Sequence, residues 1–167
     1  TRWSVWAVDL GAGAEPELVL QRDENVTPRS IAPNGDLLVR ENRLGFGTDL
    51  LIMPASGDMR PLAATTSNED SGVFSVDGHW VAYDSDISGR FEVYVTRADG
   101  AGSPIQVSTH GGRAPKFGRR GRTLYFRRHR MVMRVGFENG RPVGEAVEVF
   151  AAPNLNGPQR LPDGSVF

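Results

Sequence analysis

The chain has 167 residues, of which 39% are hydrophobic and 23% charged, a composition sufficient for one domain with a substantial core. No run of about eighteen apolar residues occurs, which excludes a transmembrane helix within this sequence. The absence of cysteine excludes disulfides, thiolate zinc sites and cysteine nucleophiles.

The first two predicted strands, at residues 5–10 and 17–20, precede a motif that occurs four times along the chain. The four copies are PNGDLLV (33–39), VDGHWVAY (76–83), RRGRTLYF (119–126) and PDGSVF (162–167). An interval of 43 residues separates the glycines of successive copies, which are Gly35, Gly78, Gly121 and Gly164. The dipeptides Asn34-Gly35 and Asp77-Gly78 predict tight two-residue hairpin turns, because Asn, Asp and Gly accept a positive φ more easily than other residues.

A further strand follows each of the first three copies, in DLLIM (49–53), EVYVT (92–96) and MVMRV (131–135). A weaker last strand lies near PLAA (61–64), PIQVS (104–108) and AVEVF (146–150). Each unit therefore reads as four short antiparallel strands in about 43 residues, which is the period of a propeller blade. Apolar residues occupy consecutive positions in these strands, which predicts that both faces of each sheet are covered, as they are in stacked blades.

One copy and its surroundings, FSVDGHWVAYDSDISGRFEVYVTRADG (74–100), resemble the TolB-like, WD-like repeat of bacterial β-propellers. The consensus of that repeat runs roughly F-S-P-D-G-x-x-[IL]-[AV]-[YF]-x-S-D-x-x-G-x-x-[ED]-[IL]-[YW]-[VLI]-x-x-x-[DN]-G. Val76 stands in place of the Pro, and a divergent Gly118-Arg119-Arg120 precedes Gly121. The resemblance implies an all-β propeller in which the S-D-x-x-G segment is a capped connection between the second and third strands.

The predicted architecture is a single β-propeller domain, residues 1–167, made of four-stranded antiparallel blades and containing about four of them. Three whole repeats span about 22–64, 65–110 and 111–152, and residues 1–21 together with 153–167 make a split blade. Ring closure would pair the strand Val5–Leu10 with the short strand that ends at Phe167. The alternatives are a half-ring that forms a homodimer through the broken-blade edge, and a piece of a larger propeller.

The segment DSDISG (84–89) resembles the first half of a calcium loop, with Asp84, Asp86 and Ser88 before Gly89. The twelfth position of such a loop holds a bidentate Glu, whereas this chain has Val95 there. The sequence therefore predicts a turn, and it predicts no metal and no cofactor. The three histidines, His79, His110 and His129, lie in different loops without metal-ligand spacing and are predicted as surface residues.

Residues 113–134 contain nine Arg or Lys and no acidic residue. Arg119, Arg120 and Arg122 flank one predicted turn, and Arg127, Arg128 and Arg130 flank the next, about 17 Å away along a strand. The two groups are therefore expected at opposite ends of a solvated hairpin. No nucleic-acid partner is predicted, and an acidic neighbouring blade, domain or polyanion is the alternative.

No G-x-S-x-G elbow, P-loop or kinase signature is present, so no catalytic residue is predicted. The expected function is that of a non-catalytic module that binds a protein or peptide through the loops at the mouth of the propeller channel. Those loops enter each first strand or join each second strand to the third. By the repeat alignment the candidate residues are Thr27, Arg29, Arg43, Asp70, Asp84, Asp86, Arg90, Arg113 and Asn156.

The resemblance further implies an extracytoplasmic bacterial setting, such as the periplasm, in which such propellers bind protein partners or form the sensor regions of receptor Ser/Thr kinases. The alternative from another class is part of an enzyme, since similar propellers gate prolyl-oligopeptidase-type peptidases and related ones carry metal-dependent lyase chemistry. A downstream G-x-S-x-G hydrolase domain would select the enzyme. An upstream kinase domain with a membrane span would select the sensor.

Overall fold

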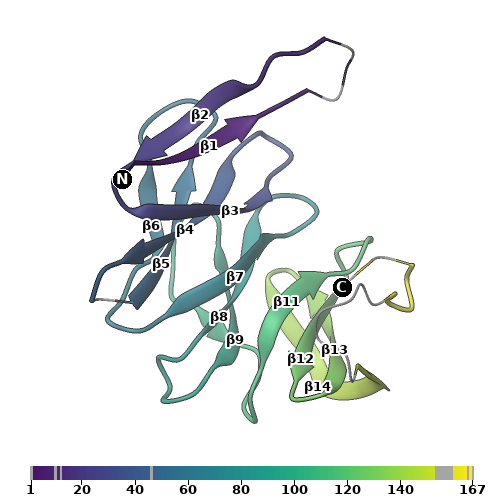
Figure 1. Cartoon of the computed structure of the whole chain (residues 1–167). Helices are drawn as coiled ribbons and strands as arrows, with labels where there is room; N and C mark the ends of the chain where they lie inside the picture. Colours follow the sequence, from purple (N-terminus) through teal and green to yellow (C-terminus); the bar gives the residue numbers. More distant parts are fainter. Residues whose placement is uncertain are drawn as a thin grey trace.

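The computed structural model describes residues 2–9, 11, 13–45, 47–152, 160–164 and 166. These residues form strands, bridges, bends and turns, arranged as three four-stranded antiparallel sheets and one two-stranded hairpin (Figure 1). This is the all-β propeller architecture that the repeat predicts.

Within each sheet the strands pair in chain order. The hairpin consists of β1 (Trp3–Ala7) and β2 (Glu17–Arg22). The first complete sheet contains β3 (Asn25–Ile31), β4 (Leu37–Arg43), β5 (Gly47–Met53) and β6 (Arg60–Ala63). The second contains β7 (Glu69–Phe74), β8 (Trp80–Ser85), β9 (Glu92–Arg97) and β10 (Ile105–Gln106). The third contains β11 (Arg113–Phe117), β12 (Thr123–Arg128), β13 (Met131–Glu138) and β14 (Arg141–Ala151).

Apolar side chains fill the space between neighbouring sheets. Leu38 and Leu50 of the first complete sheet pack in one cluster with Val81 of the second. On the opposite side of the second sheet, Val95 packs in another cluster with Phe126 of the third. Consecutive positions of β8 and β9 are buried, so both faces of that sheet are covered, as predicted. Burial of each large aliphatic side chain stabilises the fold by about 1.5–3 kcal/mol, and the sheets therefore depend on their neighbours.

Each copy of the repeated motif forms the same turn, which differs from the predicted two-residue type. The N–H groups of the four glycines donate to the carbonyl oxygen three residues earlier, and their φ angles lie between 68° and 88°. Asn34 and Asp77 do not share the positive φ that a two-residue turn would require. The glycine alone has it, because it closes a longer loop in which one residue of positive φ follows the turn. The Asp77 carboxylate instead accepts hydrogen bonds from Ser75 Oγ (2.6 Å) and the His79 N–H (3.1 Å).

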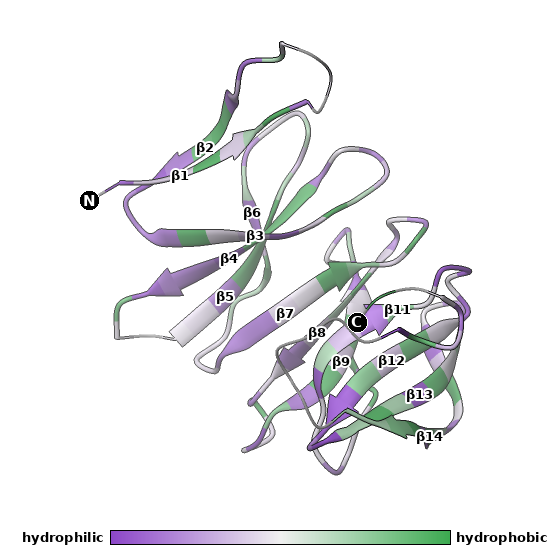
Figure 2. Cartoon of the chain, turned by 45° about the vertical axis from the view of Figure 1, so that its right-hand side comes forward, coloured by the Kyte–Doolittle hydropathy of each residue, from purple (hydrophilic) through white to green (hydrophobic). Residues whose placement is uncertain are grey.

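The two ends of the arc of sheets are held by different neighbours. At one end, Val5 of β1 packs against Val26 and Val39 of the first complete sheet, and β1 pairs with β2. At the other end, Leu161 packs against Tyr125 of the third sheet. Among the described residues, the predicted pairing of Val5–Leu10 with the strand that ends at Phe167 is not formed, because the two ends lie far apart (Figures 1 and 2). Residues 153–159, Ser165 and Phe167 of the predicted split blade lie outside the described part of the chain.

Replacing Gly78 with Val should destabilise the protein. Gly78 has a φ of 76°, and a Cβ atom added there would lie 3.0 Å from Pro33 Cδ. A β-branched residue is strained at positive φ, and we expect a loss of about 1–3 kcal/mol in the free energy of unfolding, measured by urea denaturation. Gly89→Val is the matched control, since Gly89 has a φ of 89° but no atom within 4 Å of the added Cβ, and it should lose less. Unchanged stability of the Gly78→Val variant would contradict the assigned turn.

Candidate functional site

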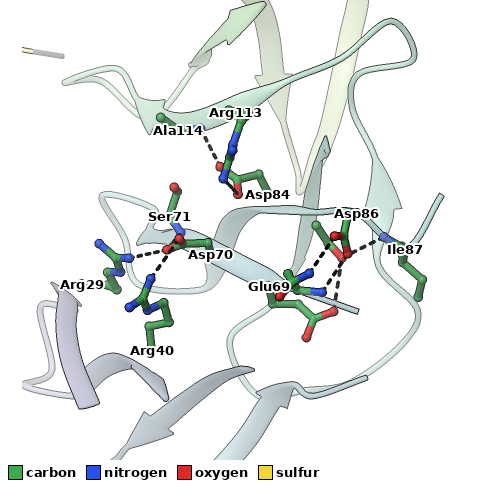
Figure 3. A network of polar contacts seen from close by, with 12 residues as sticks. Arg29, Arg40, Glu69, Asp70, Ser71, Asp84, Asp86, Ile87, Arg113 and Ala114 are labelled. Atoms are coloured by element: carbon green, nitrogen blue, oxygen red, sulfur yellow. Dashed lines mark hydrogen bonds and ion pairs between the residues drawn. The ribbon is translucent and has the colours of Figure 1, made fainter. Parts of the chain in front are cut away.

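The first strands of the complete sheets, β3, β7 and β11, contact one another in that order along the arc (Figure 1). Polar side chains on these strands and on their partners β4 and β8 form a network between the sheets (Figure 3). Strand β7 changes from a hydrophilic start at Glu69 to a hydrophobic end at Phe74 (Figure 2). The network therefore includes the polar start of β7, whereas Phe74 at the other end of that strand belongs to the apolar core.

Asp70 joins the first complete sheet to the second. Its carboxylate accepts hydrogen bonds from Arg29 on β3 and from Arg40 on β4, the latter at 3.2 Å from Nη1 to Oδ2. The Ser71 N–H donates to the same carboxylate at 2.6 Å. The three charged side chains are between 21% and 28% exposed, so these charge-assisted bonds are partly shielded from water and help to fix the two sheets together.

Asp84 joins the second complete sheet to the third. It lies opposite Asp70 in the β7–β8 register, and its side chain is fully buried. Its Oδ2 accepts a hydrogen bond from the Ala114 N–H at 2.7 Å. Its Oδ1 lies 3.9 Å from Arg113 Nη2 and has no hydrogen-bond partner among the described residues. Burial raises the pKa of Asp84, and the Ala114 N–H and the Arg113 charge counteract that rise only in part.

Ser71 and Ala114 present their N–H groups to these aspartates through an unusual backbone conformation. Their φ angles are 53° and 51°, and each lies where the pairing of the first and second strands of its sheet is irregular. Positive φ is uncommon for residues of these types, and a strand bulge redirects the groups around it. Sequence reasoning missed the role of both residues. The only sign in the sequence was that Ser71 and Ala114 occupy equivalent positions of the repeat.

Four of the predicted site residues come together in this network, namely Arg29, Asp70, Asp84 and Arg113. Sequence reasoning missed Arg40, because strand position alone does not tell which charge reaches the next sheet. The other predicted residues are spread over strands and loops nearby. Thr27 lies opposite Arg40 in the register, Arg43 pairs with Asp49, Asp86 accepts from Asn68, and Arg90 pairs with Glu92. Asn156 lies outside the described residues.

The two aspartates of the DSDISG segment bind different partners. Whereas Asp84 turns towards the third sheet, the Asp86 carboxylate accepts hydrogen bonds from the N–H and Nδ2 of Asn68 at 2.8 and 2.7 Å. These two bonds lower the pKa of Asp86. The Gly89 N–H donates to the Asp86 carbonyl oxygen at 2.8 Å, which closes a turn in this segment. In the described part of the chain, no three His, Cys, Asp or Glu side chains are grouped so that they could hold a metal.

The arginines of the basic segment divide between the two ends of β12, as predicted. Arg120 and Arg122 line a pocket of about 640 Å³ beside Trp80 at one end. Arg127 lines another pocket, of about 400 Å³, at the other end.

This second pocket brings together side chains that sequence reasoning treated separately. His110, from the loop before β11, and His129, from the turn after β12, both line it. Arg90 and Arg113 line it as well. The convergence was missed because these residues come from three different connections, and their proximity depends on how one sheet packs on the next.

No family model and no curated protein sequence matches the chain. Solved structures do match it. A TolB structure from Agrobacterium tumefaciens is 16% identical, with a TM-score of 0.63 over 90% of this chain and 62% of that chain. TolB from Acinetobacter baumannii is also 16% identical, with a TM-score of 0.71 over 96% of this chain and 41% of that chain. A puromycin-hydrolyzing peptidase from Mycobacterium tuberculosis is 15% identical, with a TM-score of 0.55 over 80% of this chain and 27% of that chain.

The chain therefore has a TolB-like β-propeller fold and spans less than two thirds of the length of these proteins. At such low sequence identity, the likeness establishes the fold alone. None of the described residues belongs to a helix that could cross a membrane.

Replacing Asp84 with Asn should remove a pH dependence of stability. Burial raises the pKa of Asp84 above its ordinary value of 3.8, so the folded chain keeps this proton at pH values where the unfolded chain has released it. Raising the pH through this window therefore favours unfolding, and Asn, which does not ionise, lacks this effect. The melting temperature of the variant minus that of the parent should increase between about pH 4 and pH 7.

The exposed Asp58 provides the matched control, Asp58→Asn, for the loss of one carboxyl group. If the melting temperature of the Asp84→Asn variant minus that of the parent stays constant or falls over this pH range, the raised pKa of Asp84 is contradicted.

Proposed function

We propose that the chain is a non-catalytic binding module that recognises a protein or peptide partner at the polar end of β3, β7 and β11. The observation that carries this proposal is the network of Arg29, Asp70, Asp84 and Arg113, which links three sheets and holds charged groups in fixed positions. A rigid scaffold with charges at the ends of its strands suits recognition, because little conformational entropy is lost on binding.

The chemistry of the network also favours binding over catalysis. Asp84 is buried and accepts a hydrogen bond from the Ala114 backbone N–H, whereas Asp70 is neutralised by two arginines. Within the described part of the chain, neither carboxylate adjoins a Ser or Thr nucleophile paired with a histidine, the arrangement on which many acyl-transfer enzymes rely. An extracytoplasmic location is part of the proposal and rests on the TolB-like repeat.

A second candidate function is that of the propeller portion of a larger enzyme or of a receptor-kinase sensor. One specific observation favours the enzyme: the fold of this chain is similar to a part of a puromycin-hydrolyzing peptidase that makes up 27% of that protein's length. Sequence that flanks the 167 residues distinguishes these candidates. A hydrolase domain with a G-x-S-x-G elbow supports the enzyme, and a kinase domain with a membrane span supports the sensor.

Peptides selected against the protein should bind at the network. Linear peptides from a random display library, remade synthetically and measured by calorimetry, should bind the parent and lose at least tenfold in affinity with Arg29→Gln, which removes a charge from the network. Arg122→Gln is the matched control, because Arg122 is an exposed arginine at the far end of β12. Failure to select any binder, or binders equally weakened by both variants, would contradict this site.

We also propose that the edge of the arc formed by β1 and β2 associates with a second copy. This sheet has two strands where the others have four, and Trp6 and Leu18 on it are 58% and 44% exposed. An unpaired strand edge with exposed aromatic side chains favours pairing with another chain. Sedimentation should therefore detect a dimer at high micromolar concentration, and Trp6→Ser should weaken it. A monomer under the same conditions, unchanged by Trp6→Ser, would refute this form of association.

A further inference from the structure

A pocket of about 400 Å³ lies between the second and third complete sheets, at the start of β11, beside the polar network. Three arginines, Arg90, Arg113 and Arg127, line it together with His110, His129 and Phe91. Two glycines complete the lining, and among the described residues no Asp or Glu side chain belongs to it, while Glu92 and Asp84 lie beside Arg90 and Arg113. The pocket is therefore cationic and has one aromatic wall.

The guanidinium groups of Arg113 and Arg90 are held in place by contacts with residues in and next to the wall of the pocket. Arg113 lies over the Phe91 ring, 3.8 Å from its centroid, which fixes the plane of the guanidinium group. Arg90 Nε donates to the buried Glu92 at 2.7 Å, and another N–H of Arg90 donates to the Thr109 carbonyl oxygen. The side chains of Arg90 and Arg113 remain 61% and 50% exposed, so these ordered cations are accessible to a ligand.

The hydrogen-bonding capacity of Arg113 is largely unused. A guanidinium group has five N–H donors. The carboxylate of Asp84 lies 3.9 Å from Arg113 Nη2, and Arg113 makes no side-chain hydrogen bond to any residue that the structure describes. The arginine is thus oriented by stacking and by charge, while its donors are available to an acceptor in the pocket.

The charges of the network alternate in sign from sheet to sheet. Arg29 and Arg40 on the first complete sheet bind Asp70 on the second, and Asp84, opposite Asp70, faces Arg113 on the third. Asp70 and Asp84 on the second sheet have arginines on both neighbouring sheets. Among the described residues, Arg113 has an aspartate partner, Asp84, only on the second sheet.

We propose that this pocket binds a carboxylate group of a peptide partner, with Arg113 as the main donor and Arg90 as the second. Planar guanidinium and carboxylate groups form paired N–H···O bonds, and a carboxylate supplies a negative charge that the described lining of the pocket lacks. The inference rests on the proposed binding function and names the chemical group that the module recognises. A nucleic-acid backbone is disfavoured, because Arg120 and Arg122 lie at the opposite end of β12 from Arg127, so the arginines of this basic segment are divided between two ends of a strand.

The test is an NMR titration of the arginine Nε–Hε signals of the intact chain with small carboxylates at constant ionic strength. N-acetylglycinate represents a C-terminal carboxylate, the α-methylamide of N-acetylglutamate represents an acidic side chain, and N-acetylglycinamide is the uncharged control. We expect saturable shifts of the Arg90 and Arg113 signals, with a Kd on the order of millimolar for at least one carboxylate. The tighter of the two carboxylates identifies the source of the group.

The variants separate the pocket from general charge effects. Arg113→Gln should weaken carboxylate binding at least fivefold, read on the Arg90 signal, whereas Arg122→Gln should leave it unchanged. Phe91→Leu, which keeps every charge but removes the stacking contact, provides a second variant if Arg113→Gln does not fold, and should weaken binding at least twofold. Shifts that do not saturate, or that are equally sensitive to Arg122→Gln, would overturn the proposal, as would tighter binding of a 12-nucleotide oligothymidylate that is lost with Arg122→Gln.

The outcomes distinguish this inference from the proposed function on which it rests. If display-selected peptides bind and respond to Arg29→Gln but the small carboxylates do not saturate the pocket, the carboxylate site is wrong and the binding module stands. If the carboxylates saturate the pocket but selected peptides ignore Arg29→Gln, the pocket is a carboxylate site and the network is not the contact surface.

Discussion

The covering of both faces of the second complete sheet is the constraint on which the rest of this structure depends. Strands β8 and β9 bury consecutive side chains, so this sheet needs an apolar neighbour on either side, and it has one in the first and third complete sheets. The fit is close: a Cβ atom added to Gly72 would lie 2.6 Å from Leu38 Cδ2 on the preceding sheet. As in other repeat proteins, stability is then shared between each unit and its contacts with its neighbours, and a single sheet would not be stable alone.

This close packing fixes where polar groups can cross from one sheet to the next. The first strands carry the crossings at one end, where Asp70 reaches back to two arginines and Asp84 reaches forward to the Ala114 N–H. Since Asp84 is fully buried, its position depends on that N–H being presented by a residue at positive φ. The backbone bulge, the buried carboxylate and the spacing of the sheets therefore form one structural unit, and a change in any of them alters the others.

The fold could be predicted from the sequence because its information is local and repeated. Glycines 43 residues apart mark equivalent turns, and runs of apolar residues mark strands that are covered on both faces. The turn type was wrong, since Asp77 caps the loop with its side chain and only Gly78 takes a positive φ, a distinction that the dipeptide does not contain. The meeting of His110 with His129 could not be predicted either, because it depends on how two sheets pack.

The equivalent positions Thr27, Asp70 and Arg113 show how one backbone supports different chemistry in successive sheets. A hydroxyl group, a carboxylate and a guanidinium group occupy the same place at the start of the first strand. The backbone tolerates this change because none of the three positions is buried, whereas in the apolar core a change of volume or charge would cost several kcal/mol. Under the proposed binding function, residues at the polar ends of the strands vary for recognition while the buried positions preserve the packing, and the order of charges along the arc is the feature that a partner reads.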